Sequence, residues 1–533
     1  MKKYLFVSAA LIIAFAACTK EAAQIDRVTI DGKEYMTFKV VINDDVVSAD
    51  TKATVSRSGV FGWEDGDPVY FVDNDGKTAE GVFSESASTI TVEAGDWVAA
   101  STARFTTKNQ LNFNNVKGPV IAAQVSGGQL HFHHVGSIIN VKFASIPYDC
   151  TLSFYSHNSE QWADGAFSFN GSGEPSLDGG GSTGVYITKD VTTADAGKDI
   201  ALSVPNLDYT EGFTINLEKG SNTFLRKWTN TARNLSTRPT LLNMAQIESQ
   251  TLTVAGAETE VFGTSWDATD TDNDLELGED GVWRISYPYT PLTYMTFKVA
   301  LDHGWGASWG EKGSSNNYSA TSLTVGKKTT ISFTFNDEIS VEQFDTYTVV
   351  GSDGLCGISW DNSGNWESTC VNDMEEVSSG VWNKVFTSVP AGDHEFKVAK
   401  NHSWSYSWGD LGGSSNVSFT TTSARDVDVF YYIANNFVRV AGISDTFRVA
   451  GSSTSVFGTS WDANNDANLM TIQNNGIYKI TYDITADEDI EYKITRDGSW
   501  WSEGDNKKVS VANGDKLTIF FNPVNSEISC SKE

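Results

Sequence analysis

Tryptophan is concentrated in the second half of this chain. Twelve of the 16 tryptophans lie within residues 251–533, and most of them recur in two short motifs. One motif is Ser-Trp-Asp, and the other is His-x-Trp-x-x-x-Trp-Gly, which directly follows a strand-like segment that carries a lysine. The C–H face of a sugar ring stacks on an indole, and an indole offers a large contact area with little conformational entropy to lose. These residue types therefore predict a surface that grips neutral polysaccharide.

Three sets of such residues are candidates for binding. In each set, two tryptophans a few residues apart in a Gly/Ser/Asn-rich loop are expected to form an angled platform, which favours a curved α-1,4-glucan over a flat cellulose ribbon. The strand lysine is placed to reach hydroxyl groups, although a merely solvated lysine explains the pattern equally well, and any one tryptophan of a β-sandwich can belong to its core. The candidates are Trp266, Lys298, Trp305 and Trp309 in the first set, Trp360, Lys397, Trp404 and Trp408 in the second, and Trp461, Lys493, Trp500 and Trp501 in the third.

The expected platforms follow from sequence proximity. They are Trp305/Trp309, Trp404/Trp408 and the adjacent pair Trp500/Trp501. Two other tryptophans, Trp283 and Trp382, each follow Gly-Val, and tyrosine replaces them in the third set. These two are expected to be structural.

The motifs mark three tandem repeats. The Ser-Trp-Asp tryptophans are 94 and then 101 residues apart, and each period is the size of a small β-sandwich domain. Within a repeat, short runs of Val, Ile, Thr, Phe and Tyr alternate with polar residues, and no helical period of useful length occurs. In residues 295–300, Phe297 and Val299 share one face while Lys298 lies on the other. We therefore predict an all-β chain with β-sandwich modules at residues 251–344, 345–444 and 445–533.

The second repeat carries the most specific resemblance. It contains Gly-x-Ser-Trp-Asp at 357–361, Pro-Ala-Gly at 390–392, Glu-Phe-Lys-Val-Ala at 395–399 and Asn-His-Ser-Trp at 401–404. This pattern resembles the starch-binding-type modules found beside pullulanase catalytic domains, and it is similar, more loosely, to the repeats of outer-membrane starch-utilisation lipoproteins. The resemblance implies α-glucan binding, with tryptophan stacking and a Lys or Asn contacting hydroxyls. The first repeat lacks Pro-Ala-Gly, and the third, which lacks the His, departs most.

Residues 27–250 are β-rich but follow a different pattern. They contain Thr-Lys-Ala-Thr at 51–54, Phe-Gly-Trp-Glu-Asp-Gly-Asp at 61–67, His-His-Val-Gly-Ser at 133–137 and Leu-Leu-Asn-Met at 241–244. These segments resemble the fimbrillin-like lipoproteins of Gram-negative anaerobes. The resemblance implies two β-sandwich lobes, at residues 27–147 and 148–250, which we interpret as a stalk.

The first 17 residues have the pattern of a secretory signal peptide. Two lysines precede an apolar run at residues 4–17 that is too short to span a bilayer. The run ends in Phe-Ala-Ala-Cys, which resembles the bacterial lipobox although Phe15 stands where Leu is more usual. The resemblance implies lipid attachment at Cys18 and an outer-membrane protein facing the cell exterior; an ordinary signal peptide with an incidental cysteine is the alternative. Of the other cysteines, Cys356 and Cys370 could form a disulfide or remain thiols.

Several function classes are disfavoured. The formal charge of −30 opposes nucleic-acid binding, which depends on Lys and Arg neutralising phosphates. A (β/α)₈ catalytic barrel needs ~250 residues of alternating strand and helix, and no such stretch occurs, so no catalytic residue and no cofactor are predicted. The aspartates at 270, 272 and 274 are spaced like calcium ligands, but the Gly and Glu of an EF-hand loop do not follow. No metal ligand is therefore predicted, with calcium left open.

The combined expectation is a non-catalytic, lipid-anchored surface protein that captures starch, pullulan or a related α-glucan. Partner proteins, such as a surface amylase or a glycan transporter, would then degrade or take up the captured polysaccharide. Two alternatives remain. One is a fimbrial or adhesin subunit that binds host glycans or proteins, and the other is a scaffold that docks a separate amylase through its tryptophans.

Overall fold

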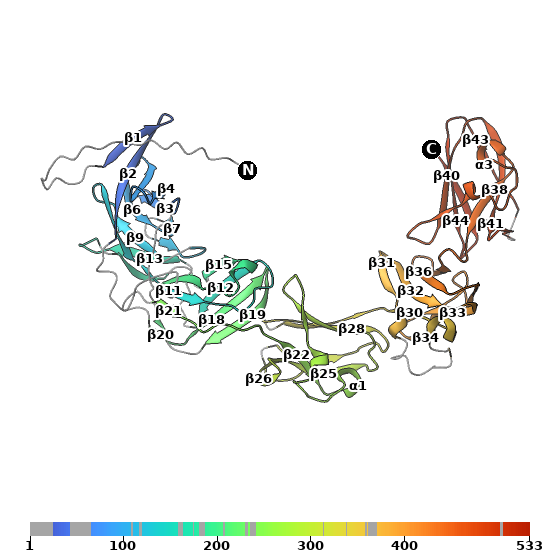
Figure 1. The fold of residues 1–533 in the computed structure, drawn as a ribbon, viewed down its shortest axis with the longest axis horizontal. Helices are drawn as coiled ribbons and strands as arrows, with labels where there is room; N and C mark the ends of the chain where they lie inside the picture. Colours follow the sequence, from blue (N-terminus) through green and yellow to red (C-terminus); the bar gives the residue numbers. More distant parts are fainter. Residues whose placement is uncertain are drawn as a thin grey trace. The chain divides into compact units, whose positions relative to one another are not determined.

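The structure is a computed structural model, and it confirms the all-β prediction (Figure 1). It describes residues 25–42, 65–107, 110–116, 120–157, 164–173, 175–180, 187–205, 208–229, 233–234, 241–312, 314–336, 338–357, 360, 370–501 and 505–533. Cys18 and the signal-peptide segment lie outside these residues. The described parts of the chain contain no helix with the length and apolar character needed to cross a membrane.

The chain divides into two compact units. The first comprises the chain up to Thr251 together with residues 277–283 and 334–336, and the second comprises the rest. In the first unit, an eight-stranded sheet has the order β1-β2-β10-β9-β6-β3-β4-β5, and an additional β2–β5 pairing joins its end strand back to β2. Alternating buried side chains such as Phe38, Phe71 and Phe132 form its core. The strands are β1 (Asp26–Ile30), β2 (Lys33–Ile42), β3 (Pro68–Asp73), β4 (Thr78–Ser84), β5 (Thr89–Glu93), β6 (Trp97–Ser101), β9 (Ile121–Gln124) and β10 (Gln129–His134).

The rest of the first unit is built from smaller sheets. β11 (Gly136–Val141), which is buried along its whole length, lies between β16 (Ile200–Pro205) and β21 (Leu241–Asn243). The lobe boundary at residue 147 stays a prediction, and β11 pairs with strands from beyond it. One four-stranded sheet has the order β15 (Ile187–Val191), β12 (Cys150–Ser156), β18 (Phe213–Lys219) and β19 (Asn222–Thr229). A second has the order β14 (Pro175–Gly180), β13 (Asp164–Phe169), β8 (Gln110–Asn112) and β7 (Arg104–Thr107). The short strands β17 (Asp208–Tyr209) and β20 (Arg233–Asn234) form a two-stranded sheet, and η2 (Thr193–Asp195) is a short 3-10 turn.

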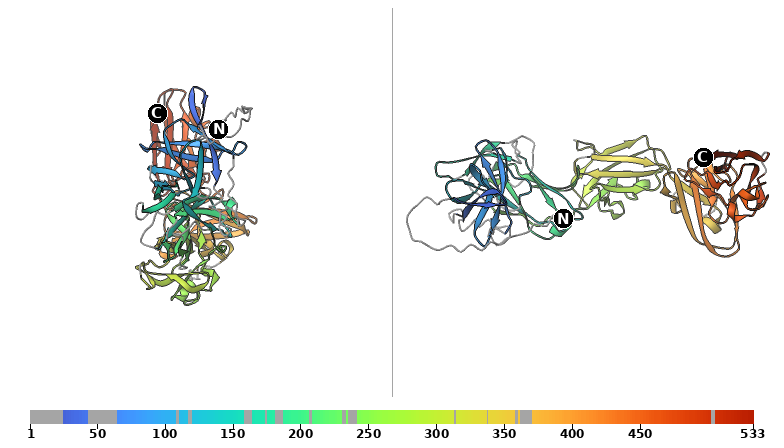
Figure 2. Two further views of the ribbon diagram at one scale, coloured as in Figure 1. Left: turned by 90° about the vertical axis from the view of Figure 1, so that its left-hand side faces the viewer. Right: turned by 90° about the horizontal axis from the view of Figure 1, so that it is seen from above.

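Each tryptophan-rich repeat has the same two four-stranded sheets, and their layers can be followed for the first repeat in Figures 1 and 2. In the sheet that bears the lysine, the long central strand has one neighbour on one side and two on the other. In the first repeat this sheet holds β22 (Leu252–Gly256), β25 (Tyr294–Leu301), β26 (Gly304–Trp309) and β27 (Tyr318–Thr321), and its partner holds β23 (Glu276–Leu277), β24 (Trp283–Tyr287), β28 (Lys328–Thr334) and β29 (Glu338–Phe344).

The other repeats follow the same order. In the second repeat, the lysine-bearing sheet holds β30 (Tyr347–Gly351), β33 (Gly392–Lys400), β34 (Ser403–Trp408) and β35 (Val417–Thr421). Its partner sheet holds β31 (Glu375–Ser378), β32 (Val381–Val389), β36 (Arg425–Tyr432) and β37 (Phe437–Val440). In the third repeat, the lysine-bearing sheet holds β38 (Phe447–Gly451), β41 (Glu488–Arg496), β42 (Ser499–Trp500) and β43 (Lys507–Val511). Its partner sheet holds β39 (Thr471–Ile472), β40 (Tyr478–Asp483), β44 (Lys516–Asn522) and β45 (Glu527–Lys532). Single-turn helices follow the first strand of each repeat: α1 (Thr259–Phe262), α2 (Asp353–Cys356) and α3 (Thr454–Phe457); the 3-10 turns η3 (Thr271–Asn273) and η5 (Asp466–Asn468) lie in the first and third repeats.

A glycine at the end of the first strand lets this helical turn pack closely. A Cβ atom on Gly256 would lie 2.1 Å from the Phe262 ring, and one on Gly451 would lie 2.3 Å from the Phe457 ring. Both rings are buried. Only glycine allows the helix to seat its phenylalanine there, and the chain then runs on into Ser-Trp-Asp.

The two tryptophans expected to be structural are confirmed as such. Trp283 is buried, and its indole N–H donates to the Phe224 carbonyl oxygen at 2.8 Å. Trp382 packs against the core of the second repeat, and the corresponding Tyr478 is buried in the third.

Candidate functional site

The lysine-bearing strand presents one face to the core and the other outward. Phe297 and Val299 are fully buried, whereas Lys298 is half-buried on the opposite face of β25, which confirms the predicted alternation. Lys298 lies opposite Ala255 of β22. Lys397 and Lys493 occupy the same position in β33 and β41, opposite Val350 and Ala450. We call this side of the sheet the outer face.

The Ser-Trp-Asp segment of the first repeat lies on the outer face. Ala255 and Ala300 point outward from β22 and β25, and they form a small buried cluster with Ala268. The Trp266 N–H donates to the Gly256 carbonyl oxygen at 2.7 Å, and the same bond joins Trp461 to Gly451 at 2.8 Å in the third repeat. The motif is therefore held beside the strand that carries the lysine.

In every repeat, the Ser-Trp-Asp ring meets the first tryptophan after the lysine strand. We call these rings the platform pairs. Their centroids are 5.8–6.3 Å apart, and their planes are inclined by 30–61°. The outer ring of each is well exposed, at 48% for Trp305, 37% for Trp404 and 47% for Trp500. The pairs are Trp266/Trp305, Trp360/Trp404 and Trp461/Trp500.

The predicted pairing within the loop, Trp305/Trp309, Trp404/Trp408 and Trp500/Trp501, is therefore wrong. The second ring of each turns toward the core. The ring centroid of Trp309 lies 5.2 Å from that of Phe333, and the Trp408 ring stacks on Tyr431 with centroids 5.1 Å apart. The ring centroids of Trp501 and Phe521 are 5.4 Å apart. These three rings support the sheet from within.

Strand register explains this inward turn. Trp309 lies directly opposite Val299, and Trp408 directly opposite Val398. Directly opposed residues of antiparallel strands project to the same face, and both valines are core residues. A register shift follows Ala300 and Ala399, which frees the intervening tryptophan to project outward. In the third repeat, Trp500 lies opposite Thr495, on the face of Lys493.

Two of the platform tryptophans have a strained backbone. Trp266 and Trp461 have φ values of 52° and 55°. This left-handed region is rare for bulky residues and costs about 1–3 kcal/mol. Strain of this kind persists where the surrounding fold enforces it, commonly at binding sites. It favours a functional role for the Ser-Trp-Asp ring.

Polar groups border the platform pairs. The Lys298 amine donates to the Ser315 carbonyl oxygen at 2.8 Å. Asp267 follows Trp266 directly, and hydrogen bonds from the Thr269 hydroxyl and N–H lower the pKa of its exposed carboxyl group. Both groups are able to form hydrogen bonds with sugar hydroxyls.

The histidine of the second motif has a structural role. His303 occupies a two-residue turn with φ values of 51° and 53° at Asp302 and His303, the type I′ geometry of tight hairpins. Its Nε2 lies 3.0 Å from Asp274, which also accepts from Thr253. This network positions the hairpin that carries Trp305.

The second repeat holds the corresponding network around His402. Its Nε2 lies 2.9 Å from Asp373, which accepts from Thr348. Burial opposes the charged form of His402, but hydrogen bonds with Asp373 and Cys370 outweigh it and raise its pKa to about 10.

Two residues of the second repeat were missed from sequence. Tyr406 lies on β34 between its two tryptophans and is 65% exposed, and its aromatic character in a polar segment was the available signal. Cys370 was considered only as a disulfide partner. In the described residues no disulfide joins it to Cys356. The Cys370 Sγ lies 3.5 Å from His402 Nε2, whereas the Cys356 thiol is buried and lies 3.8 Å from the Val349 carbonyl oxygen.

Comparisons with known proteins agree with the predicted resemblance. Residues 351–437, from the end of β30 to the start of β37, match the family model of the pullulanase X25 domain. Two amylopullulanases are each 27% identical to part of this chain. That of Thermoanaerobacterium saccharolyticum matches over 177 residues, which is 30% of this chain and 14% of the relative. That of Thermoanaerobacter thermohydrosulfuricus matches over 163 residues, which is 26% of this chain and 10% of the relative. The chain thus spans a small fraction of these relatives' length.

Two solved structures were also matched. SusF from Bacteroides thetaiotaomicron aligns over 80% of this chain and 96% of its own, with 13% identity and a TM-score of 0.16. The pullulanase from Bacillus acidopullulyticus aligns over 61% of this chain and 34% of its own, with 14% identity and a TM-score of 0.15.

Proposed function

We propose that this protein is a non-catalytic cell-surface lipoprotein that binds starch-like α-glucans through its three platform pairs. The observation that carries the proposal is the recurrence of an inclined pair of indoles, partly exposed, at the same place in all three repeats. The match of residues 351–437 to a domain of pullulanases supports the choice of α-glucan.

The geometry suits a curved chain of sugars. Successive glucose rings of a helical α-glucan present their faces at an angle, so two coplanar indoles would contact only one of them well. Rings inclined by 30–61° can each meet a different sugar. The strand lysines lie on the outer face of each lysine-bearing sheet and supply hydrogen-bond donors for sugar hydroxyl oxygens. They are Lys298, Lys397 and Lys493.

Three weak sites on one chain are effective together. Stacking contributes roughly 0.5–1.5 kcal/mol per aromatic contact beyond area burial. Once one repeat has bound a long polymer, the others bind it at high effective concentration, which can raise apparent affinity by 10²–10⁴. Tandem sites therefore favour long polysaccharides over short oligosaccharides.

The remaining parts of the proposal rest on sequence motifs. Lipid attached at Cys18 would hold the protein on the outer membrane, and two or more acyl chains suffice for stable anchoring. The β-rich region before residue 251 would act as a stalk that carries the repeats outward. A surface amylase or glycan transporter would receive the captured glucan.

Affinity electrophoresis tests the proposal. The full chain is run through gels containing amylopectin, pullulan, dextran or xylan. We expect selective retardation by amylopectin and pullulan, and loss of that retardation in the triple variant Trp305→Ala, Trp404→Ala, Trp500→Ala. Trp228→Ala is the matched control, because this tryptophan is 56% exposed but lies outside the repeats. Unretarded migration of the parent chain in all four gels would contradict glucan binding and make the exposed rings candidate protein contacts, as in an adhesin.

A further inference from the structure

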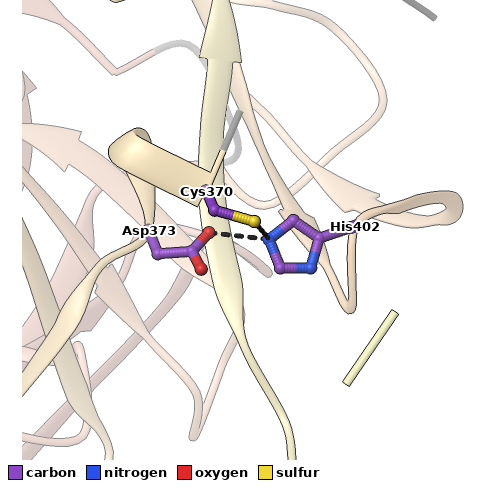
Figure 3. Close-up of side chains that lie close together, drawn as sticks. All are labelled: Cys370, Asp373 and His402. Atoms are coloured by element: carbon purple, nitrogen blue, oxygen red, sulfur yellow. Dashed lines mark hydrogen bonds and ion pairs between the residues drawn. The ribbon is translucent and has the colours of Figure 1, made fainter. Parts of the chain in front are cut away.

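Three potential metal ligands converge in the second repeat (Figure 3). One ligand atom from each of Cys370, Asp373 and His402 lies within 4.8 Å of the others. Cys370 Sγ and Asp373 Oδ1 lie 3.5 Å and 2.9 Å from His402 Nε2. Figure 3 shows the thiol and the carboxylate pointing toward the same ring nitrogen.

Local structure positions the first two ligands. Cys370 begins a 3-10 turn, and the Asp373 N–H donates to the Cys370 carbonyl oxygen at 3.0 Å, so both side chains leave the turn together. Asn372, inside the turn, is buried and donates from its side chain to the Cys356 carbonyl oxygen at 3.0 Å. The turn is thereby tied to the helical turn α2.

The third ligand is oriented from the opposite side. The His402 side chain is fully buried, at 0% exposed, and its Nδ1 lies 2.7 Å from the Gly326 carbonyl oxygen. A carbonyl oxygen accepts only from a protonated nitrogen, so Nδ1 carries a proton and Nε2 is left to face the thiol and the carboxylate. A ring nitrogen held by a backbone carbonyl is the usual arrangement behind a metal-ligating histidine.

The fold leaves little freedom at this contact. Gly326 has a φ of 89°, and a Cβ atom there would lie 2.0 Å from the Asn401 carbonyl oxygen. Only glycine permits the first repeat to approach the turn that carries His402 so closely. On the other side, the Thr348 hydroxyl donates to Asp373. The carboxylate and the imidazole are thus each oriented by a group outside the cluster.

We propose that Cys370, Asp373 and His402 form a binding site for a divalent transition-metal ion, with Zn²⁺ as the best fit. Thiolate, imidazole and carboxylate together suit zinc, which prefers four ligands in a tetrahedron. Zn–S and Zn–N bonds of about 2.3 and 2.0 Å place sulfur and nitrogen ~3.5 Å apart at a tetrahedral angle, the separation seen here. The carboxylate must move by only a few tenths of an ångström, because the metal replaces its hydrogen bond to Nε2. Water completes the coordination.

The other repeats provide natural controls. In the first repeat, His303 and Asp274 make the same contact, but Thr271 stands where the second repeat has Cys370. In the third repeat, Leu469 and Gly498 replace the carboxylate and the histidine. The thiol is therefore what distinguishes the second repeat, and the metal would fix the hairpin turn immediately before Trp404. Cys370 and His402 are 32 residues apart in the sequence, so no local motif predicts a metal here.

Titration of the full chain with Co²⁺, a spectroscopic substitute for Zn²⁺, tests this site. We expect a thiolate-to-cobalt charge-transfer band and intense tetrahedral visible bands that saturate at one equivalent per chain and disappear when Zn²⁺ is added. Cys370→Ser should abolish the charge-transfer band, and His402→Ala should weaken Co²⁺ binding at least 10-fold. Far-ultraviolet circular dichroism confirms that each variant is folded.

Three matched variants complete the experiment. Cys530→Ser removes an exposed thiol, Cys18→Ser removes the thiol of the signal region, and His303→Ala removes the histidine of the repeat without a nearby thiol. All three should retain one equivalent with an unchanged spectrum. Absence of a charge-transfer band in the parent chain, or a band that persists in folded Cys370→Ser, would overturn the assignment. These outcomes do not depend on glucan binding.

Discussion

The ring centroids of Trp360 and Trp404 lie 5.8 Å apart and the ring planes are inclined by 30°, although the two residues belong to different segments of the second repeat. Trp408, four residues after Trp404, stacks instead on the buried Tyr431. Neighbours in sequence thus point to opposite faces of one sheet. The difference between an exposed platform ring and a supporting ring can be measured by mutation.

Trp404→Ala should weaken glucan binding and leave stability almost unchanged. The ring is 37% exposed, so its loss removes a stacking surface worth roughly 1 kcal/mol, or about 5-fold in affinity at this repeat. The measurement is retardation in amylopectin gels alongside a urea denaturation curve. Retardation equal to that of the parent chain would exclude this ring from the site.

Trp408→Ala should have the opposite effect. Its ring packs against Tyr347 and Tyr431 in the core of the second repeat, and truncating a large core side chain typically costs about 3–5 kcal/mol. Because Trp408 is only partly buried, we expect about 2–4 kcal/mol. Urea denaturation followed by fluorescence measures this loss. If the midpoint were unchanged while glucan binding fell, Trp408 would belong to the platform after all.

Asp345 should stabilise the junction of the first two repeats in a pH-dependent manner. Partial burial raises its pKa, but hydrogen bonds from Lys400, Asn401 and Lys327 outweigh this and lower the pKa from 3.8 to about 2. The folded state therefore favours the ionised form. The resulting stability is complete above pH 4 and is lost as the pH falls from about 4 toward 2.

Asp345→Asn tests this directly. At pH 7 the variant should lose about 1 kcal/mol of unfolding free energy, since the pair is partly exposed. The difference from the parent chain should shrink at pH 3, as measured by urea denaturation at both pH values. An equal difference at pH 7 and pH 3 would assign the effect to packing.

The cysteine thiols should differ sharply in reactivity. Burial raises the pKa of Cys150 and Cys356 to about 12, so neither forms the reactive thiolate at pH 8. Cys530 is exposed. Iodoacetamide at pH 8 should therefore modify Cys530 in the native protein, and Cys150 and Cys356 only after denaturation, as read by peptide mass spectrometry. Fast native modification of Cys356 would show that the helical turn α2 opens readily.

Local sequence patterns were sufficient for the architecture of the repeats. The alternation of Phe297, Lys298 and Val299 predicts a strand with one buried face because side chains of a strand alternate with period two. The spacing of Trp266, Trp360 and Trp461 predicts three modules because one unit recurs at nearly constant length. Both signals lie within a few residues or in a simple repetition, so no knowledge of tertiary contacts is needed.

The composition of the site was only partly predictable. Trp266, Trp305 and their counterparts were identified as candidates from residue type, but their partnership was not. It depends on the register shift between β25 and β26, which turns Trp305 outward and Trp309 inward. A one-residue change of register reverses the face of every later side chain, and sequence proximity cannot reveal it.

The sequence by itself thus determined an all-β chain, its tandem repeats and the kinds of side chain available for binding, because periodicity and composition are local properties. Only the tertiary structure decided which tryptophans meet and that Cys370 lies beside His402. These contacts join segments far apart in the chain. They exist because strand pairing and packing within each repeat bring those segments together, at positions that no local pattern encodes.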